Sequence, residues 1–257
     1  MGSEERKEEI LQLLRAGQGA IRIDALCAKI YASRSTIRRD LIDLETEGMI
    51  TRHFGAVSLV HSSPDESSVA RRHLENTDKK MLIGKAAGTY IHDGMVLFLD
   101  SSSTVSYLLP AIRAHRNLTI VTNSIRIAME LSGVPDIRCF ICPGMVKTNS
   151  YSVIGEYASE FLVHFRAQTT FLSCKSIREE GIFEGSDSQA LIKRRMIEYS
   201  DQVILLCDSS KENASGYFRL TGFDQLDLVI SDLPLRKSII DALSEEGCAF
   251  RAVRAGG

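Results

Sequence analysis

Three arginines lie close together in the sequence SRSTIRRDLIDL, residues 33–44. Arg34, Arg38 and Arg39 carry guanidinium groups, which pair with phosphates and with the guanine edge in DNA. Aliphatic residues recur there at the spacing of one buried helix face: Ile37, Leu41 and Leu44. Ser33 suits the N-cap of this helix. Such a helix could enter the major groove of DNA, or it could be a surface helix whose charges are merely solvated.

A second group of polar residues follows the short apolar runs later in the chain. Asp100 and the sequence SSST (101–104) follow the first run, and TNS (122–124) follows the second. Lys175 and Lys211 follow two later runs. Ligands of open α/β sheets bind beyond the carboxyl ends of the strands. Hydroxyls, backbone N–H groups and lysines at that edge indicate an anion site, although serines at a helix start are often only caps.

The elements that would position the arginines form a winged helix-turn-helix. Short helices are expected at residues 8–14 and 23–30, and the third follows a three-residue connection. Gly48 suits a left-handed end for this third helix. Residues 49–60 alternate enough to predict a hairpin wing, with Arg52 and His53 near its tip.

From residue 94 onward, short apolar runs alternate with amphipathic stretches, which indicates a mostly parallel sheet covered on both faces. The predicted strands are 95–100, 118–123, 137–142, 169–174, 202–208 and 227–232. The fold class is therefore α/β, with an N-terminal winged helix-turn-helix. The expected parts are a DNA-binding domain (1–60), a polar linker (61–74) and an effector-binding and oligomerisation domain (75–257).

Composition limits the class of protein. The chain has 257 residues, 44% of them hydrophobic, and a net charge of −2, so any positive DNA-binding surface must be local. No apolar run approaches the ~20 residues of a membrane span, and we expect a cytoplasmic protein without a membrane partner. Cys139 and Cys142 form a C-x-x-C pair inside a predicted strand, where they would point to opposite faces. We therefore expect reduced thiols and no metal.

The run TIRRDLIDLETEGMITRHFGAV resembles the N-terminal signature of the DeoR family of bacterial transcriptional regulators. The resemblance continues through LDSSSTV, VTNSIRIA, PGMVK, GEYA, KRRMIEYSDQVILLCDSSK and LDLVISD. It departs from the family pattern at the single Gly55 of the wing, at Pro143-Gly144 and at SCKSI around Lys175. It implies a repressor of carbohydrate genes, with an effector domain that resembles sugar phosphate isomerases in fold and senses a phosphorylated sugar. It implies no cofactor.

The helix pattern and the resemblance together predict two sets of site residues. The predicted DNA contacts are Ser33, Arg34, Ser35, Thr36, Arg38, Arg39, Arg52 and His53. The resemblance implies that the effector is held by Asp100, Ser101, Ser102, Ser103, Thr104, Thr122, Asn123, Ser124, Gly144, Lys175 and Lys211. The expected partners are a double-stranded DNA operator, a small-molecule sugar phosphate and a second copy of the chain, as a homodimer or homotetramer.

Two other functions remain open from the sequence. A sugar phosphate isomerase with a DNA-binding appendage would need a carboxylate base. In related isomerases this acid lies in a turn corresponding to residues 173–177, which here contains Lys175 and no carboxylate, although Glu179, Glu180 and Glu184 are near. Alternatively, the α/β domain could serve only for oligomerisation. Turnover and ligand binding with candidate sugar phosphates distinguish these possibilities.

Overall fold

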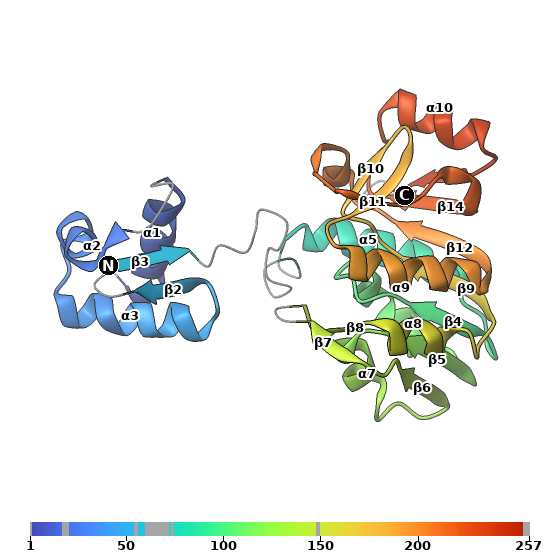
Figure 1. The fold of residues 1–257 in the computed structure, drawn as a ribbon, viewed down its shortest axis with the longest axis horizontal. Helices are drawn as coiled ribbons and strands as arrows, with labels where there is room; N and C mark the ends of the chain where they lie inside the picture. The colour runs from blue at the N-terminus through green and yellow to red at the C-terminus, as the bar shows by residue number, and fades with distance from the viewer. Residues whose placement is uncertain are drawn as a thin grey trace. The chain divides into compact units, whose positions relative to one another are not determined.

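The computed structural model of the protein describes residues 2–16, 21–53, 56–59, 72, 75–147 and 150–253. The chain divides into two compact units, residues 1–64 and 65–257 (Figure 1). Except for Arg72, the expected linker 61–74 lies outside the described residues, and so does Gly55 of the wing. Each unit has its own buried core.

The described residues of the first unit form three helices and a three-stranded antiparallel sheet. Its elements are α1 (Ser3–Ala16), β1 (Ile21–Arg22), α2 (Ile23–Ile30), α3 (Arg34–Thr46), β2 (Ile50–His53) and β3 (Ala56–Leu59). The strand order is β1-β3-β2, so the predicted winged helix-turn-helix is confirmed. The sequence pattern did not predict β1, because two residues are too few to show an alternation. Helix α1 also extends beyond the predicted residues 8–14.

The core of this unit explains why α3 forms where it does. The predicted stripe is buried, with Ile37 and Leu41 fully inaccessible, and it packs with residues of α1 and α2 in one cluster. The Ser33 hydroxyl accepts a hydrogen bond from the Thr36 backbone N–H at 3.2 Å, which is the predicted N-cap. At the other end, Gly48 has a φ of +71°, a left-handed conformation that glycine adopts without a Cβ clash.

A seven-stranded parallel sheet forms the centre of the second unit. Its strand order is β15-β14-β12-β9-β4-β5-β6, and every neighbouring pair runs parallel. The strands are β4 (Val96–Leu99), β5 (Leu118–Thr122), β6 (Ile137–Ile141), β9 (Ala167–Leu172), β12 (Ser200–Leu206), β14 (Leu228–Ser231) and β15 (Ala249–Ala252). This confirms the predicted parallel α/β domain. The sequence analysis did not include β15, whose four residues lack a long apolar run.

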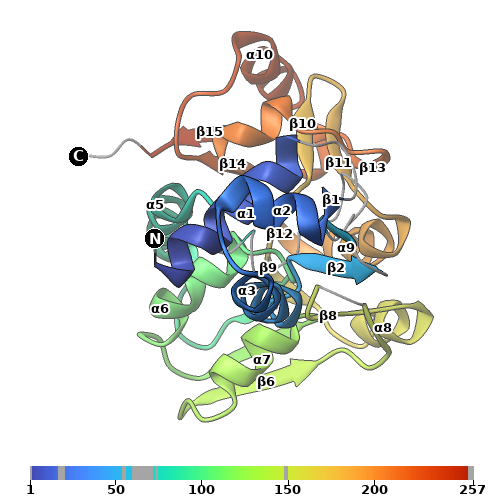
Figure 2. The same cartoon turned by 90° about the vertical axis from the view of Figure 1, so that its left-hand side faces the viewer.

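Helices cover both faces of the sheet (Figures 1 and 2). One face packs against α5 (Thr77–Ala87), the 3₁₀ turn η2 (Val105–Leu108), α6 (Leu109–Ile112) and α7 (Ile125–Leu131). The other face packs against α8 (Glu156–Leu162), α9 (Asp187–Glu198) and α10 (Lys237–Glu245). Alternate residues of one strand therefore serve two cores: Leu97 and Leu99 face the first layer, and Phe98 faces the second.

Short strands extend the fold beyond the sequence prediction. The hairpin β7–β8 joins Met145–Lys147 to Ser152–Ile154, and a small antiparallel sheet contains β10 (Ser176–Arg178), β11 (Gly181–Glu184) and β13 (Phe218–Thr221). The 3₁₀ helices η1 (Gly88–Tyr90), η3 (Ser209–Asn213) and η4 (Phe223–Gln225) complete the elements of the described residues. The amphipathic stretch after SSST is only a 3₁₀ turn followed by four helical residues, with Pro110 in the first turn.

Among the described residues, none of the helices has the length and apolar character of a membrane span. The described ranges also contain no group of three or more His, Cys, Asp or Glu side chains that could hold a metal ion. The thiols of Cys139 and Cys142 are free, and burial raises their pKa, to about 11 and about 12 respectively.

Candidate functional site

The N-terminal half of α3 presents an exposed basic surface. Arg38 and Arg39 are exposed, and no ion pair joins either one to another described residue. Arg34 is also exposed and lies 3.5 Å from Asp24 of α2, between Nε and Oδ1. At the helix start, the Ser33 hydroxyl bonds to the hydroxyls of Ser35 and Thr36, at 2.9 Å and 2.8 Å. This arrangement leaves guanidinium groups toward solvent on the face opposite the core.

The wing is the second predicted DNA-contacting element. Arg52 and His53 are the last two residues of β2, paired with Val57 and Ala56 of β3. This places them at the end of β2 from which the chain continues to β3, the predicted position. Their side chains lie outside the described part of the structure.

A buried carboxylate fixes α3 against α1, and the sequence analysis did not identify it. Asp40 is 1% exposed and accepts hydrogen bonds from Arg6 Nε at 2.7 Å, Arg6 Nη2 at 3.0 Å and Ser3 Oγ at 2.9 Å. Burial acts to raise the pKa of Asp40, but the bonds from Arg6 and Ser3 outweigh it, so the pKa is lowered. Asp40 therefore holds the arginine-bearing helix against α1 from its buried side.

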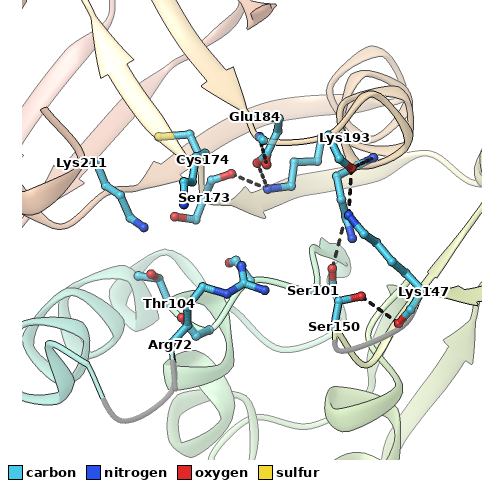
Figure 3. Close-up of a pocket in the computed structure, with 16 residues that line it drawn as sticks. Arg72, Ser101, Thr104, Lys147, Ser150, Ser173, Cys174, Glu184, Lys193 and Lys211 are labelled. Carbon is cyan, nitrogen blue, oxygen red and sulfur yellow. Dashed lines mark hydrogen bonds and ion pairs between the residues drawn. The ribbon is translucent and has the colours of Figure 1, made fainter. Parts of the chain in front are cut away.

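In the second unit, a pocket opens at the carboxyl ends of the central strands (Figure 3). Ser101 to Thr104 follow β4, Ser173 to Lys175 follow β9, and Lys211 lies in η3 after β12. The remaining lining comes from elements that the sequence did not connect with this site. Its residues are Arg72, Lys147, Ser150, Glu184, Gly185, Ser186, Gln189 and Lys193.

The pocket has the polarity of an anion site. Its lining contains five basic side chains (Arg72, Lys147, Lys175, Lys193 and Lys211) and one carboxylate, Glu184. The Ser173 hydroxyl also lines it; this residue is 1% exposed, and the described structure gives its Oγ no hydrogen-bond partner. A buried hydroxyl without a partner is costly unless a ligand or water satisfies it. Serine hydroxyls and several cations at one point can hold a phosphate.

A buried ion cluster supports the floor of the pocket. Asp100 is inaccessible to solvent, and its Oδ2 lies 2.8 Å from Lys193 Nζ. The Asp100 carboxylate also accepts the Ser102 and Ser173 backbone N–H groups, at 2.8 Å and 2.9 Å. Lys193 Nζ further donates to Glu184 and, at 2.6 Å, to the Ser173 carbonyl. Burial lowers the pKa of Lys193, but Asp100 and Glu184 raise it more, so this lysine stays protonated.

This arrangement differs from the role expected for Asp100. Its carboxylate is directed into the protein and occupied by Lys193 and two backbone donors, so it shapes the loop rather than cradling a phosphate. It also occupies the Ser102 N–H, one of the backbone N–H groups at this edge of the sheet. The hydroxyl-bearing residues 101–104 line the pocket, as do Lys175 and Lys211.

Four other predicted residues lie behind the pocket lining. Thr122 is fully buried and donates from its hydroxyl to the Leu99 carbonyl at 2.7 Å. Ser124 caps α7 through the Ile127 N–H, and Gly144 packs against the Ile154 carbonyl of the β7–β8 hairpin. Asn123 donates from its side-chain amide to Oγ of Ser101, a lining residue, at 3.4 Å. These four residues support the site and do not line it.

Most of the lining residues that the sequence analysis missed had no local signal. Lys193 stands in the run KRRM, which reads as the charged face of a surface helix. Gln189 joins the site through a 2.7 Å hydrogen bond to Ser152 of β8, and Lys147 through a 3.1 Å bond to Ser186. These contacts cross large distances along the chain, so only the folded structure shows them.

Comparison with known proteins agrees with this two-part organisation. Residues 6–63 match the DeoR-like helix-turn-helix domain, and residues 75–233 match the DeoR C terminal sensor domain. The chain is 32% identical over 253 residues to the "Uncharacterized HTH-type transcriptional regulator YulB" of Bacillus subtilis (strain 168), covering 97% of this chain and 96% of that protein. It is 29% identical over 246 residues to the glycerol-3-phosphate regulon repressor of Escherichia coli (strain K12), covering 95% of this chain and 97% of that protein.

Among solved structures, the chain is similar over part of its length to ribose 5-phosphate isomerase A of Methanocaldococcus jannaschii. The alignment covers 53% of this chain and 55% of that one, at 16% identity and a TM-score of 0.39. The relatives that match over nearly the full length are transcriptional regulators and not enzymes. The resemblance that the sequence motifs indicated is therefore confirmed: the chain belongs to the DeoR family of helix-turn-helix transcriptional regulators, with a C-terminal sensor domain.

Proposed function

We propose that this regulator is a repressor whose affinity for its operator is controlled by a phosphorylated sugar bound in the pocket of Figure 3. The observation that carries the proposal is the lining itself: serine and threonine hydroxyls of residues 101–104 face basic side chains, Lys211 among them. The name of the glycerol-3-phosphate regulon repressor, a relative at 29% identity, is consistent with a small phosphorylated effector.

In this proposal each part of the chain has a separate task. Residues 1–60 read double-stranded DNA through α3 and the wing, residues 61–74 connect the parts, and residues 75–257 bind the effector and hold copies of the chain together. A single winged domain contacts few base pairs, so a homodimer or homotetramer would supply two or more half-sites. The protein would act in the cytoplasm on carbohydrate genes.

Two pocket variants test the proposal. Lys211→Ala removes a charge-assisted contact, and Ser103→Asp places a carboxylate against the phosphate. Both should bind operator DNA like the wild type when no effector is present, because the changes lie in the sensor unit. Both should lose the change in operator affinity that a cognate phosphorylated sugar causes, since a ligand shifts an equilibrium only through the states it binds.

The measurement is operator affinity at fixed salt, with and without each member of a panel of phosphorylated sugars, because salt alone changes such affinities strongly. Thermal unfolding in the same panel identifies the binder; at 100 times its dissociation constant a ligand adds roughly 2.7 kcal/mol of stability. If Lys211→Ala responds like the wild type, the pocket is not the effector site. A panel in which nothing binds would favour a sensor unit that serves only for assembly.

A further inference from the structure

Arg72 is an unusual member of the pocket lining, because of its place in the chain. All other lining residues fall between Ser101 and Lys211, within the α/β sheet and its loops. Arg72 instead precedes α5, at the end of the stretch that leads from the DNA-reading unit into the sensor unit. In Figure 3 its side chain extends into the pocket beside Thr104, across from Ser173 and Lys211. A ligand bound in the pocket would therefore contact Arg72 directly.

A buried lysine fastens the backbone at Arg72. Lys80 of α5 is 3% exposed, and its ammonium donates to the Arg72 carbonyl and, at 2.6 Å, to the Glu75 carbonyl. Burial lowers the pKa of Lys80 to about 8; Asp208 and Glu75 act to raise it, and Lys211 and Arg72 to lower it. Lys80 is not part of the pocket lining. Its contacts hold the chain at the point where Arg72 enters the pocket.

The same stretch is joined to η3, the element that carries Lys211. Asn76 Nδ2 lies 3.2 Å from Ser210 Oγ and 3.4 Å from Asp208 Oδ1. Lys79 Nζ donates to Ser209 Oγ at 3.0 Å and lies 3.5 Å from Asp232 Oδ2. We call Arg72 and residues 75–80 the connector. The connector and η3 thus form one hydrogen-bonded assembly that contributes two cations to the pocket.

We propose that Arg72 contacts the anionic group of the effector and that the connector, held by Lys80, transmits effector binding to the DNA-reading unit. This rests on the sensing function proposed above. A ligand that attracts the side chains of Arg72 and Lys211 also displaces the backbone at Arg72, on the side of the helix-turn-helix. Because Lys80 is bonded to the Arg72 and Glu75 carbonyls, it couples the movement of this backbone to that of the Arg72 side chain. Without Lys80, the ligand would still bind, but the chain before α5 would no longer be fixed to the pocket.

The test separates binding from response in the full chain. The probes are a triose phosphate, a pentose 5-phosphate, a hexose 1-phosphate and a hexose 6-phosphate, and the DNA is the region upstream of the chain's own gene. Lys80→Met keeps the side-chain length and removes the donor, and Lys80→Arg keeps a donor. Lys85→Met, an exposed lysine on the same helix, is the matched control.

We expect Lys80→Met to bind the best probe within about threefold of the wild type, the range of a substitution outside the contact. The effect of that probe on operator affinity, typically about 5- to 150-fold in coupled systems, should be lost. Lys80→Arg and Lys85→Met should keep it. Arg72→Ala should lose the response and bind the probe about tenfold or more weakly, as for a lost charge-assisted hydrogen bond.

A Lys80→Met variant that responds like the wild type overturns transmission through the connector. If Lys80→Met does not fold, as thermal unfolding would show, Arg72→Ala decides, because it leaves the Lys80 contacts to backbone carbonyls in place. Wild-type binding and response in Arg72→Ala overturn the proposal. These outcomes differ from failure of the proposed function, in which the wild type itself binds none of the probes and both proposals fall.

Discussion

Replacing Lys193 by Met should destabilise the sensor unit strongly, even without any ligand. Lys193 is 5% exposed, and its ammonium joins two carboxylates that the fold buries, Asp100 and Glu184. Methionine fills a similar volume but leaves both acids without their counter-charge. Asp100 would keep the backbone N–H groups of Ser102 and Ser173 and lose its only ion pair among the described residues.

Removing one member of a buried ion pair costs about 3–5 kcal/mol, because the remaining charge stays desolvated. One kcal/mol shifts the melting temperature of a unit of this size by roughly 2–4 °C. The sensor transition should therefore fall by roughly 6–20 °C. Adding Asp100→Asn and Glu184→Gln to Lys193→Met should recover part of this loss, since the charges that lack a partner are then gone.

Calorimetry of the full chain at pH 7 without ligand measures the sensor transition directly. Arg195→Met is the matched control on the same helix: its exposed ion pair with Glu198 should be worth only about 0–1 kcal/mol. If Lys193→Met costs no more than Arg195→Met, the buried cluster does not support the pocket floor, and the reasoning is wrong.

Three further predictions concern the DNA-reading unit and the connector. Arg39→Ala should weaken operator binding by about 1–3 kcal/mol if the arginine reads a base, whereas Ile37→Ala should leave an intact surface but cost about 2–5 kcal/mol of stability in urea unfolding. Asp40→Asn should lower the free energy of unfolding by about 1.5–3 kcal/mol at pH 7. Because the pKa of Asp40 is lowered in the folded state, this contribution is complete above the unfolded pKa of about 3.9 and should be lost as urea unfolding is repeated at lower pH. The folded pKa of Lys80, about 8, is below its unfolded value of ~10.4, so the unfolded state binds more protons between these two pH values. The free energy of unfolding of the wild type, relative to that of Lys80→Met, should therefore rise by up to about 3 kcal/mol between about pH 8 and ~10.4. A difference that stays constant over this range would contradict a buried ammonium.

The parts of the fold that depend on local sequence patterns could be predicted from the sequence. The serine cap and aliphatic stripe of α3 predicted its position, because both the cap bond and the buried face involve residues within two turns. The apolar runs likewise predicted six of the parallel strands. The site was only half predictable. A strand end shows that Asp100 lies at the correct edge of the sheet, but not that its carboxylate turns inward to Lys193, which stands far along the chain on α9.

The remaining lining of the pocket shows the same limit. Lys147, which is bonded to Ser186, lies in a hairpin whose strands have three residues each. Such strands are too short for the sequence to show an alternation of apolar and polar residues. Arg72 stands in a polar stretch whose composition predicts a linker, and only the fold brings it to the serines of residues 101–104. Sequence motifs therefore identified the lining residues that follow the strands, whereas the contacts of the other lining residues arise from tertiary packing.

The order of the strands bears on when during synthesis the sensor becomes competent. β4, β5 and β6 are made first and lie on one side of the sheet, while β9, β12, β14 and β15 are made later and lie on the other. The two halves meet where β4 pairs with β9, and the pocket straddles this seam, with hydroxyls from the early half and Lys175 and Lys211 from the late half. Long-range pairing of this kind is a late and slow event in folding. A chain still emerging from the ribosome would lack the complete pocket. A ligand bound there would contact both halves of the sheet and stabilise their association. It would thereby slow their separation and protect the completed regulator from proteolysis.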